Sequence, residues 1–170
     1  MIRILHLTDF HLNTKTLKDW NDFLKKPFLD KITEINKVQN IDLVLFTGDM
    51  IDKAGKDFGS VSDALYSFKE NVISPILTEL NLDISRFIIC PGNHDINRNA
   101  DKPFHEIGLK GNLDSIDKIN SFINSNEEDY DGIQRLKEYK DFEFKLYEGI
   151  EEKLHSKFKF STKLNIKGKS

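Results

Sequence analysis

The sequence has 170 residues, enough for one domain with a well-buried core, and it is 38% hydrophobic and 31% charged, as expected for a soluble globular protein. Its net charge of −3 gives no general attraction to nucleic acid or membranes, and no apolar run approaches the roughly 18 residues of a membrane-spanning helix. The single cysteine, Cys90, excludes an internal disulfide framework, and no signal peptide precedes the first apolar stretch, so we expect a cytoplasmic protein.

The first predicted strand spans residues 2–8 and leads into Asp9-Phe10-His11. Within it, His6 lies between leucines, and we expect a core histidine or one that supports a ligand, with direct metal binding as the alternative. The apolar side chains that follow recur at helical spacing and predict a helix that Pro27 kinks or splits. They form one stripe, which favours core packing over a cofactor contact: Trp20, Phe23, Leu24, Phe28, Ile32, Ile35 and Val38.

The second predicted strand spans residues 41–47 and leads into Gly48-Asp49-Met50-Ile51-Asp52. Residues 53–60 are expected to form a glycine-containing loop, and Ser60 or Ser62 is expected to cap the next helix. That helix should bend or break near Pro75. Its apolar stripe contains Val61, Ala64, Leu65, Phe68, Val72, Ile76, Leu77 and Leu80.

The third predicted strand, Phe87–Cys90, is apolar throughout and suits a position that is covered on both faces. We therefore expect Cys90 to be buried as a small hydrophobic side chain rather than to be a reactive thiol. Pro91 and Gly92 end the strand, and Asn93-His94-Asp95 follow. The alternation of strands and helices up to residue 95 predicts an α/β fold with parallel strands and right-handed crossovers.

Residues 96–156 do not continue this alternation, and we expect them to form a helical insertion. Residues 96–111 are polar and are predicted to be irregular, a short helix is predicted around 113–123, and residues 124–132 form an acidic loop. A long helix is predicted over residues 133–154. From residue 157 apolar and polar residues alternate, which predicts a strand whose lysines favour a solvated face over a phosphate-binding one.

Each predicted strand thus delivers polar side chains just past its carboxyl end, the edge where parallel α/β sheets bind ligands. Asp9 and His11 flank one residue, so both side chains can turn toward one ion from an extended backbone. Asp49 can bridge two ions about 3.5–4 Å apart, and Asn93 offers a neutral oxygen to the second ion. Mn²⁺, iron or Zn²⁺ suits such ligands, and the alternative is three polar loop ends with capping and turn roles.

His94 and Asp95 add acid–base chemistry to the same edge of the sheet. The imidazole of His94 can donate a proton to a leaving oxygen, and the Asp95 carboxylate can fix its tautomer and raise its pKa. A hydroxide held between two metal ions would then attack phosphorus in line with the leaving group.

Three motifs of this chain resemble the first three motifs of the calcineurin-like metallophosphoesterase superfamily: Asp9-Phe10-His11, Gly48-Asp49-Met50-Ile51-Asp52 and Gly92-Asn93-His94-Asp95. The resemblance implies a two-metal phosphoesterase built on an αββα sandwich, with residues 1–95 as the first βαβαβ half of its core. It implies that Asp9 and His11 bind the first metal and that Asp49 bridges the pair. Asn93 would bind the second metal, and His94 would contact the phosphate and act as the acid, with Asp95 behind it.

The chain departs from this superfamily in several places. Lys53 stands where its protein phosphatases have a phosphate-binding arginine, and Asp95 stands where they have glutamate, so the diesterase and nuclease branches are favoured. The later histidine motifs have no counterpart, and we expect His105 and His155 to be surface or packing residues rather than substitute ligands. Residues 157–170 would begin a truncated second sheet, so we expect the N-terminal part of a longer phosphoesterase.

The sequence therefore predicts metal-dependent hydrolysis of phosphoesters, above all of phosphodiesters such as nucleic acid or a nucleotide, with two divalent ions and Mn²⁺ favoured over iron or zinc. Because the chain carries only part of the site, we expect the isolated 170-residue chain to be inactive or weakly active. One alternative is a non-catalytic metal- or nucleotide-binding regulatory module. Another is an interaction fragment, in which the rest of the parent protein or another chain completes the sheet. No membrane partner is expected.

Overall fold

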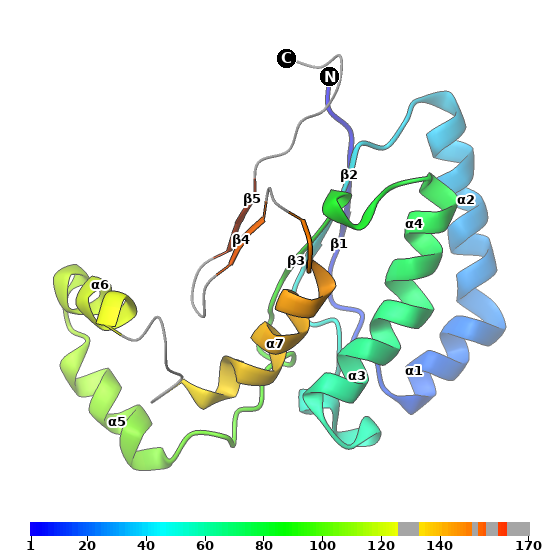
Figure 1. Cartoon of the computed structure of the whole chain (residues 1–170). Helices are drawn as coiled ribbons and strands as arrows, with labels where there is room; N and C mark the ends of the chain where they lie inside the picture. The colour runs from blue at the N-terminus through cyan, green and yellow to red at the C-terminus, as the bar shows by residue number, and fades with distance from the viewer. Residues whose placement is uncertain (126–132, 151–152, 156–159, 163–170) are drawn as a thin grey trace. The chain divides into compact units, whose positions relative to one another are not determined.

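The computed structural model describes residues 1–125, 133–150, 153–155 and 160–162. The chain forms two compact units, and the boundary between them lies between Asp95 and Ile96 (Figure 1). All three predicted strand-end motifs belong to the first unit. The fold of that unit therefore decides whether the motifs meet.

A parallel sheet of three strands organises the first unit. Strands β1 (Ile4–Leu7), β2 (Leu43–Thr47) and β3 (Phe87–Cys90) lie in the order β1-β2-β3. Leu7 pairs with Phe46, and Phe46 pairs with Ile89, so the carboxyl ends of the strands share one edge. The predicted α/β fold with parallel strands is confirmed, although β1 and β2 begin later along the chain than predicted.

Helical segments connect the strands. Between β1 and β2 lie α1 (Thr14–Asp19), η1 (Trp20–Leu24) and α2 (Lys25–Val38). Between β2 and β3 lie η2 (Lys53–Phe58), α3 (Val61–Phe68), η3 (Lys69–Ile73), α4 (Ser74–Leu80) and η4 (Ile84–Arg86). Helices α2 and α4 lie side by side on one side of the sheet (Figure 1).

The start of the second crossover was predicted as a loop followed by a serine cap. Ser60 does cap α3, because its side chain accepts a hydrogen bond from the backbone N–H of Asp63 at 3.0 Å. The segment η2, within the predicted loop, instead forms short 3₁₀ turns, with Ala54 and Gly55 in the left-handed region.

Both predicted proline sites lie just after a widened, π-helical turn. Turn η1 ends at Leu24, shortly before Pro27, and turn η3 ends shortly before Pro75. At η3 the amide of Ser74 donates to the carbonyl oxygen five residues earlier. Proline cannot donate to the preceding turn and crowds it, so the ladder is displaced at these points. Each helix is widened rather than split.

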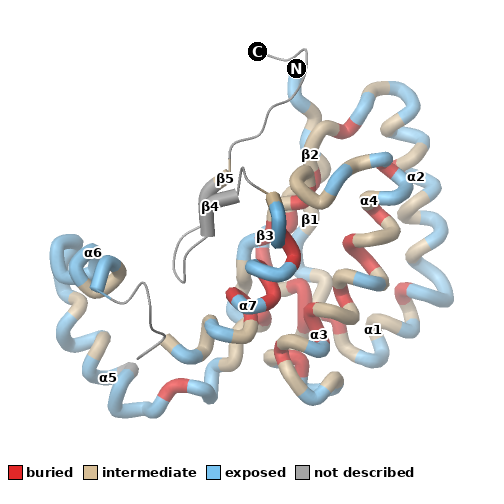
Figure 2. Tube along the Cα trace, in the orientation of Figure 1, coloured by how far each residue is buried: buried red, intermediate tan, exposed pale blue. Residues whose placement is uncertain are grey.

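The two faces of the sheet differ in how far their residues are buried (Figure 2). One face carries the four buried strand residues: Val44, Phe46, Phe87 and Ile89. Successive side chains of a strand point to opposite faces, so Ile4, His6 and Cys90 lie on the other face of the sheet. These three residues are exposed. The prediction that Cys90 is buried is therefore wrong, as is the prediction of a core position for His6. The opposite face of β3 is partly covered, since Ile88 is half-buried.

The second unit contains more helix than predicted. Helix α5 spans Pro103–Asn112, so the prediction of an irregular segment over residues 96–111 is wrong there. Pro103 suits the first turn of a helix, whereas Gly108 and Gly111 weaken the helical signal in the sequence. Helix α6 (Ile116–Ser125) confirms the short predicted helix. Most of the predicted acidic loop, residues 126–132, lies outside the described residues.

The long helix predicted over residues 133–154 is shorter in the structure. It begins as η5 (Gln134–Leu136), continues as α7 (Lys137–Leu146) and gives way to a turn in which Gly149 has a φ of 80°. Lys153 and Leu154, at the end of the predicted helix, belong instead to β4 (Lys153–His155), which pairs antiparallel with β5 (Phe160–Thr162). Other residues of the predicted tail strand lie outside the described residues. No helix in the described part of the chain is long and apolar enough to cross a membrane.

Asp101 ties two segments of the second unit together. One of its carboxylate oxygens accepts from the amide of Gln134 at 2.8 Å, and the other accepts from the amide and the Nε of Arg135 at 3.2 and 2.9 Å. Burial opposes ionisation of Asp101, but these hydrogen bonds and the Arg135 charge outweigh it and lower the pKa of the carboxyl. The start of α5 is thereby fixed to the segment that precedes α7.

Candidate metal centre

The loops that follow β1 and β2 continue the pairing of the two strands. The backbone N–H groups of Asp9, His11 and Leu12 donate to the carbonyl oxygens of Gly48, Asp49 and Met50 at 3.1, 2.9 and 3.0 Å. Leu12 also forms a parallel bridge with Ile51. Backbone hydrogen bonds alone therefore hold the first two motifs against each other.

Phe10 anchors the first motif in the core. Its ring centroid lies 5.2 Å from that of Trp20 and 5.3 Å from that of Phe68, with edge-to-face geometry in both pairs. Because the central residue of Asp9-Phe10-His11 packs inward, its two neighbours are left to face the polar edge. This is the sequence signal of the site: an aromatic residue between two ligand-type side chains.

The ligand-type residues adopt an unusual backbone conformation. Asp9, His11 and Asp49 have φ values of 56°, 50° and 55°, in the left-handed region that residues with side chains rarely adopt. The expected extended backbone at Asp9 and His11 is therefore wrong. Such conformations cost free energy and persist where the surrounding structure enforces them, which is frequent at functional sites.

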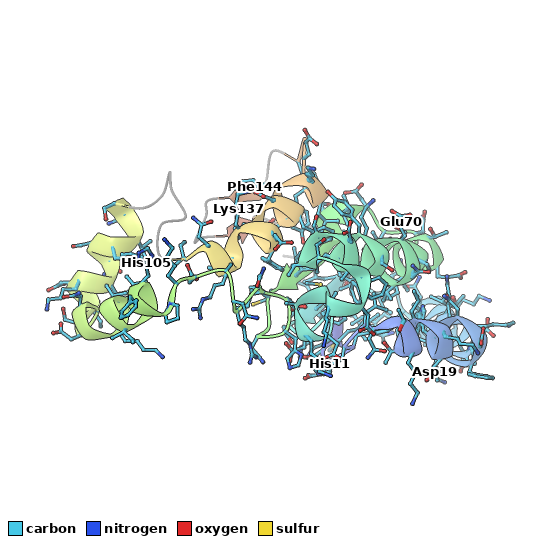
Figure 3. All side chains as sticks on the ribbon, turned by 90° about the horizontal axis from the view of Figure 1, so that it is seen from below. His11, Asp19, Glu70, His105, Lys137 and Phe144 are labelled. Atoms are coloured by element: carbon cyan, nitrogen blue, oxygen red, sulfur yellow. The ribbon has the colours of Figure 1, made fainter. Side chains whose placement is uncertain are left out.

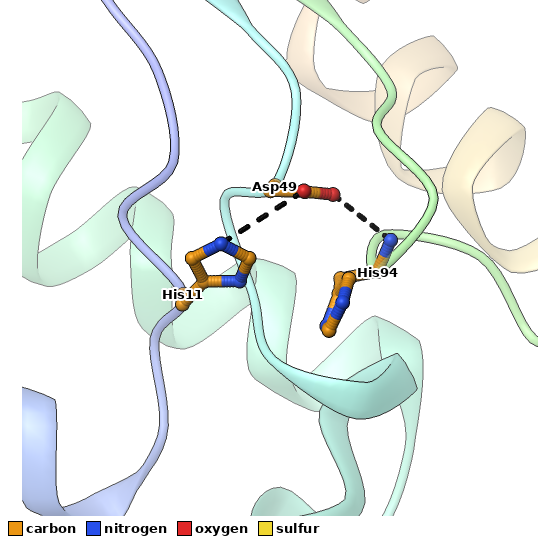
Figure 4. A group of neighbouring side chains, drawn as sticks. All are labelled: His11, Asp49 and His94. Atoms are coloured by element: carbon orange, nitrogen blue, oxygen red, sulfur yellow. Dashed lines mark hydrogen bonds and ion pairs between the residues drawn. The ribbon is translucent and has the colours of Figure 1, made fainter.

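His11, Asp49 and His94 converge beyond the sheet edge. Each offers one possible ligand atom, and these atoms all lie within 4.8 Å of one another. Figure 4 shows the Asp49 carboxylate beside both histidines, whose imidazole ring centroids are 4.8 Å apart. Oδ2 of Asp49 is 3.9 Å from Nε2 of His11. One residue from each of the three strand-end loops thus contributes to a single cluster.

Asp9 borders this cluster on the side of His11. Its Oδ1 lies 3.7 Å from Nε2 of His11, and its side chain is 63% exposed. Its Oδ2 accepts a hydrogen bond from the hydroxyl of Thr8 at 2.6 Å. The predicted pair of Asp9 and His11 is therefore brought together by the structure.

The loop after β3 packs directly on Asp49. The backbone N–H of His94 donates to Oδ1 of Asp49 at 2.9 Å, as one dashed line in Figure 4 marks. A Cβ added at Gly92 would collide with this carboxylate and with the backbone nitrogen of Asp49. Only glycine allows this approach of the two loops, and only 16% of the Asp49 side chain remains exposed.

The carboxylate at the imidazole of His94 comes from Asp52. Its Oδ1 lies 3.0 Å from Nδ1 of His94, and the backbone N–H of Lys53 lies 3.1 Å from the same nitrogen. With a proton on Nδ1, His94 donates to Asp52; without one, Nδ1 accepts from the Lys53 amide. Sequence reasoning missed this role of Asp52, whose signal is its place three residues after Asp49 in the second motif.

Asp95, which was expected behind His94, instead holds the backbone of two loops. It is fully buried, and its two oxygens accept from the amides of Ile51 and Gly92 at 3.0 and 2.7 Å. Burial raises the pKa of the Asp95 carboxyl, against the lowering effect of these hydrogen bonds. Asp95 thereby fixes the loop after β2 to the loop after β3. The position beside the His94 imidazole that was expected for Asp95 is occupied by Asp52.

Three other residues considered as ligands from the sequence do not belong to the cluster of His11, Asp49 and His94. Asn93 is exposed in the loop between Gly92 and His94, so its predicted role as a ligand of a second ion stays a prediction. His6 donates to or accepts from the hydroxyl of Thr47 at 2.7 Å. His105 is an exposed residue of α5 in the second unit, where Figure 3 labels it.

The side chains of the cluster fit a divalent transition metal. Two imidazoles with one or two carboxylates are the donor set preferred by Mn²⁺, iron and Zn²⁺ in proteins. Asp49 and Asp9 bring negative charge, which offsets the charge of a cation, while His11 and His94 bring neutral nitrogen ligands when unprotonated. His11, Asp49 and Asp9 would hold such an ion, with His94 close enough to join them or to face a substrate.

Comparisons with known proteins identify the family. A search of the curated proteins finds no match to this chain. The family model for calcineurin-like phosphoesterases matches residues 2–163, a span that includes all the residues of the cluster. With a parallel α/β core and a polar cluster at its carboxyl edge, the chain belongs to the calcineurin-like phosphoesterase family, a family of metal-dependent hydrolases.

Proposed function

We propose that this chain binds divalent metal ions at the edge of its sheet and takes part in the hydrolysis of phosphodiesters, with nucleic acid or a nucleotide as the substrate class. The observation that carries the proposal is the convergence of His11, Asp49 and His94 within 4.8 Å, one from each strand-end loop. Three separate loops rarely bring such side chains to one point unless a ligand binds there.

The residues of the cluster have distinct roles in this proposal. Bound divalent ions, with Mn²⁺ favoured and two expected, would neutralise phosphate charge and lower the pKa of a water molecule. Asp9, His11 and Asp49 hold the ions, and Asn93 would complete the second position. His94 donates a proton to the leaving oxygen, and the Asp52 carboxylate at 3.0 Å orients its ring.

The preference for a diester rests on the charge near His94. Lys53 supplies one exposed ammonium group, 3.6 Å from Oδ2 of Asp52, where protein phosphatases of the superfamily have an arginine. A monoester dianion needs more cationic partners than a diester, which carries one negative charge. A forked guanidinium would bind phosphate oxygens in pairs, whereas a lysine acts as a single point charge.

The first test combines metal binding and hydrolysis by the purified chain. We expect Mn²⁺ to bind in titration calorimetry and bis-p-nitrophenyl phosphate to be hydrolysed slowly, and faster than p-nitrophenyl phosphate. Asp49→Asn keeps the size of the side chain and tolerates the left-handed backbone, and we expect it to weaken Mn²⁺ binding at least about tenfold and to abolish turnover.

The control for this test is Asp30→Asn, which removes an exposed carboxylate that pairs with Lys26 on α2. It should leave both readouts unchanged. Equal diester hydrolysis by the Asp49→Asn variant would contradict the proposed function. Mn²⁺ binding by this chain, together with no turnover by the full-length parent protein, would favour the alternative of a non-catalytic, metal-binding regulatory module.

A further inference from the structure

Thr8, the residue between β1 and the first motif, makes a short contact with a candidate ligand. Its hydroxyl lies 2.6 Å from Oδ2 of Asp9, within the roughly 2.5–2.7 Å range of hydrogen bonds from a hydroxyl to a carboxylate. The hydroxyl oxygen of Thr8 also lies 3.1 Å from the carbonyl oxygen of Thr47, the last residue of β2. A hydroxyl has one proton, and the shorter contact to the charged acceptor is the stronger of the two.

Fewer contacts hold the carboxylate of Asp9, at the border of the cluster, than hold that of Asp49. Asp49 accepts a backbone N–H from His94 and lies against Gly92. The side chain of Asp9 is largely exposed, and Thr8 provides the short hydrogen bond to its carboxylate among the described contacts. An exposed aspartate rotates freely unless such a bond restrains it, and ordering it on metal binding then costs free energy.

The two carboxylate oxygens of Asp9 have different partners. Oδ2 is taken by Thr8, and Oδ1 faces Nε2 of His11 at 3.7 Å. We propose that Thr8 is a positioning residue, which holds Asp9 so that Oδ1 binds the ion shared with His11. This inference rests on the proposed metal site and adds to it a residue that binds no metal itself.

The consequence is a specific dependence of metal affinity on one hydroxyl. Thr8→Val keeps the branched shape and removes the hydroxyl, and we expect it to weaken Mn²⁺ binding by about 10–100-fold, the usual effect of removing a group that orients a ligand. Thr8→Ser keeps the hydroxyl, and its affinity should stay within about threefold of the original. Thr8→Ala and Thr8→Ser differ only in the hydroxyl, so this pair gives the same comparison if the valine variant does not fold.

The experiment is titration calorimetry of the metal-free chain with Mn²⁺, together with thermal unfolding of each variant without metal. Thr78→Val is the matched control, because the Thr78 hydroxyl donates to a helix carbonyl, that of Ser74 at 2.9 Å on α4, away from the candidate ligands. It should bind Mn²⁺ with unchanged affinity. A loss of affinity with an unchanged metal-free unfolding midpoint in the valine or alanine variant, restored by serine, supports the positioning role.

Two results would overturn the inference, and they are distinguishable. If the original chain binds Mn²⁺ and the variants without a hydroxyl bind it equally well, Thr8 does not position Asp9 and the proposed metal site survives. If the original chain does not bind Mn²⁺, the proposed metal site itself fails and the role of Thr8 fails with it.

Discussion

Individual residues of the candidate centre are held in place by close backbone contacts. Asp9, His11 and Asp49 all have positive φ values, and Gly92 lies so close to Asp49 that no side chain fits between them. The geometry of the cluster therefore depends on residues that bind no metal.

Gly92→Ala should disrupt the cluster without touching any ligand directly. The new Cβ would overlap Asp49 Oδ1, so either the carboxylate or the loop after β3 must move. We expect Mn²⁺ affinity to fall more than about tenfold and stability to fall by about 1–3 kcal/mol, as for other overpacked sites. Calorimetry and urea unfolding measure the two effects.

Gly108→Ala in α5 is the matched control for this substitution. An added Cβ there meets nothing within 4 Å, and alanine favours a helix over glycine. The control should bind Mn²⁺ normally and be as stable as the original chain or more so. Normal Mn²⁺ binding by Gly92→Ala would show that the contact between Gly92 and Asp49 does not position the ligand.

Asp95 should make stability depend on pH in a direction opposite to that of most aspartates. Burial raises its pKa above the ordinary value of 3.8, so between these two values the folded chain binds more protons than the unfolded chain. Through this group, the free energy of unfolding is highest below pH 3.8 and falls as pH rises through the raised value. Asp95→Asn removes this titration.

The measurement for Asp95 is urea unfolding of the metal-free chain and of Asp95→Asn over a series of pH values. The stability of the original chain relative to the variant should decline as pH rises through that window. A difference that stays constant or grows with pH would contradict the raised pKa.

At the scale of elements, one hydrogen bond links the two π-helical turns. Pro75 has no N–H to donate to the carbonyl of Asn71, four residues earlier, and the indole Nε1 of Trp20 donates to that carbonyl at 2.9 Å instead. The ring of Trp20 also contacts Phe10, the anchor of the first motif. Trp20 thus joins the first crossover to the second and supports the loop that carries Asp9.

Trp20→Phe should cost about 1–3 kcal/mol of unfolding free energy, because the partly buried hydrogen bond to Asn71 is lost and some side-chain volume is removed. In a Pro75→Ala background the backbone N–H at position 75 becomes available to that carbonyl, so the same substitution should cost less. Guanidinium unfolding of the four chains gives the coupling between the two positions. Equal costs in both backgrounds would show that the indole does not replace a missing helix hydrogen bond.

The elements also show where local pattern was sufficient and where it was not. Long apolar stripes predicted the helices of both crossovers, and serine capping predicted the start of α3, because these signals act over a few residues. Helix α5 was missed because its glycines weaken the helical pattern. The strand β4 was missed because its sequence continues the helical pattern of residues 133–154. Its strand character comes from pairing with β5, which lies further along the chain.

At the scale of the whole molecule, family membership predicts that metal binding stabilises the folded chain. An ion that binds only the folded state adds about 2.7 kcal/mol when its concentration is 100 times its Kd. We therefore expect Mn²⁺ to raise the thermal unfolding midpoint and EDTA to reverse the rise. His11→Ala should reduce the shift strongly, since it removes one side chain of the cluster.

His105→Ala is the control, because His105 is an exposed residue of α5 outside the cluster. It should show the full Mn²⁺-dependent rise. An equal rise in the His11 and His105 variants would place the stabilising ion away from the proposed centre.

The sequence by itself determined the order of the elements of the first unit, the parallel sheet and the positions of its polar motifs, because hydrophobic periodicity and chain breakers are local. It also determined the family, since the three motifs and their spacing are read along the chain. The tertiary structure decided which partners these residues have. Asp52 rather than Asp95 meets His94, and Cys90 lies on the exposed face of β3, because such contacts join segments some forty residues apart or depend on what covers a face.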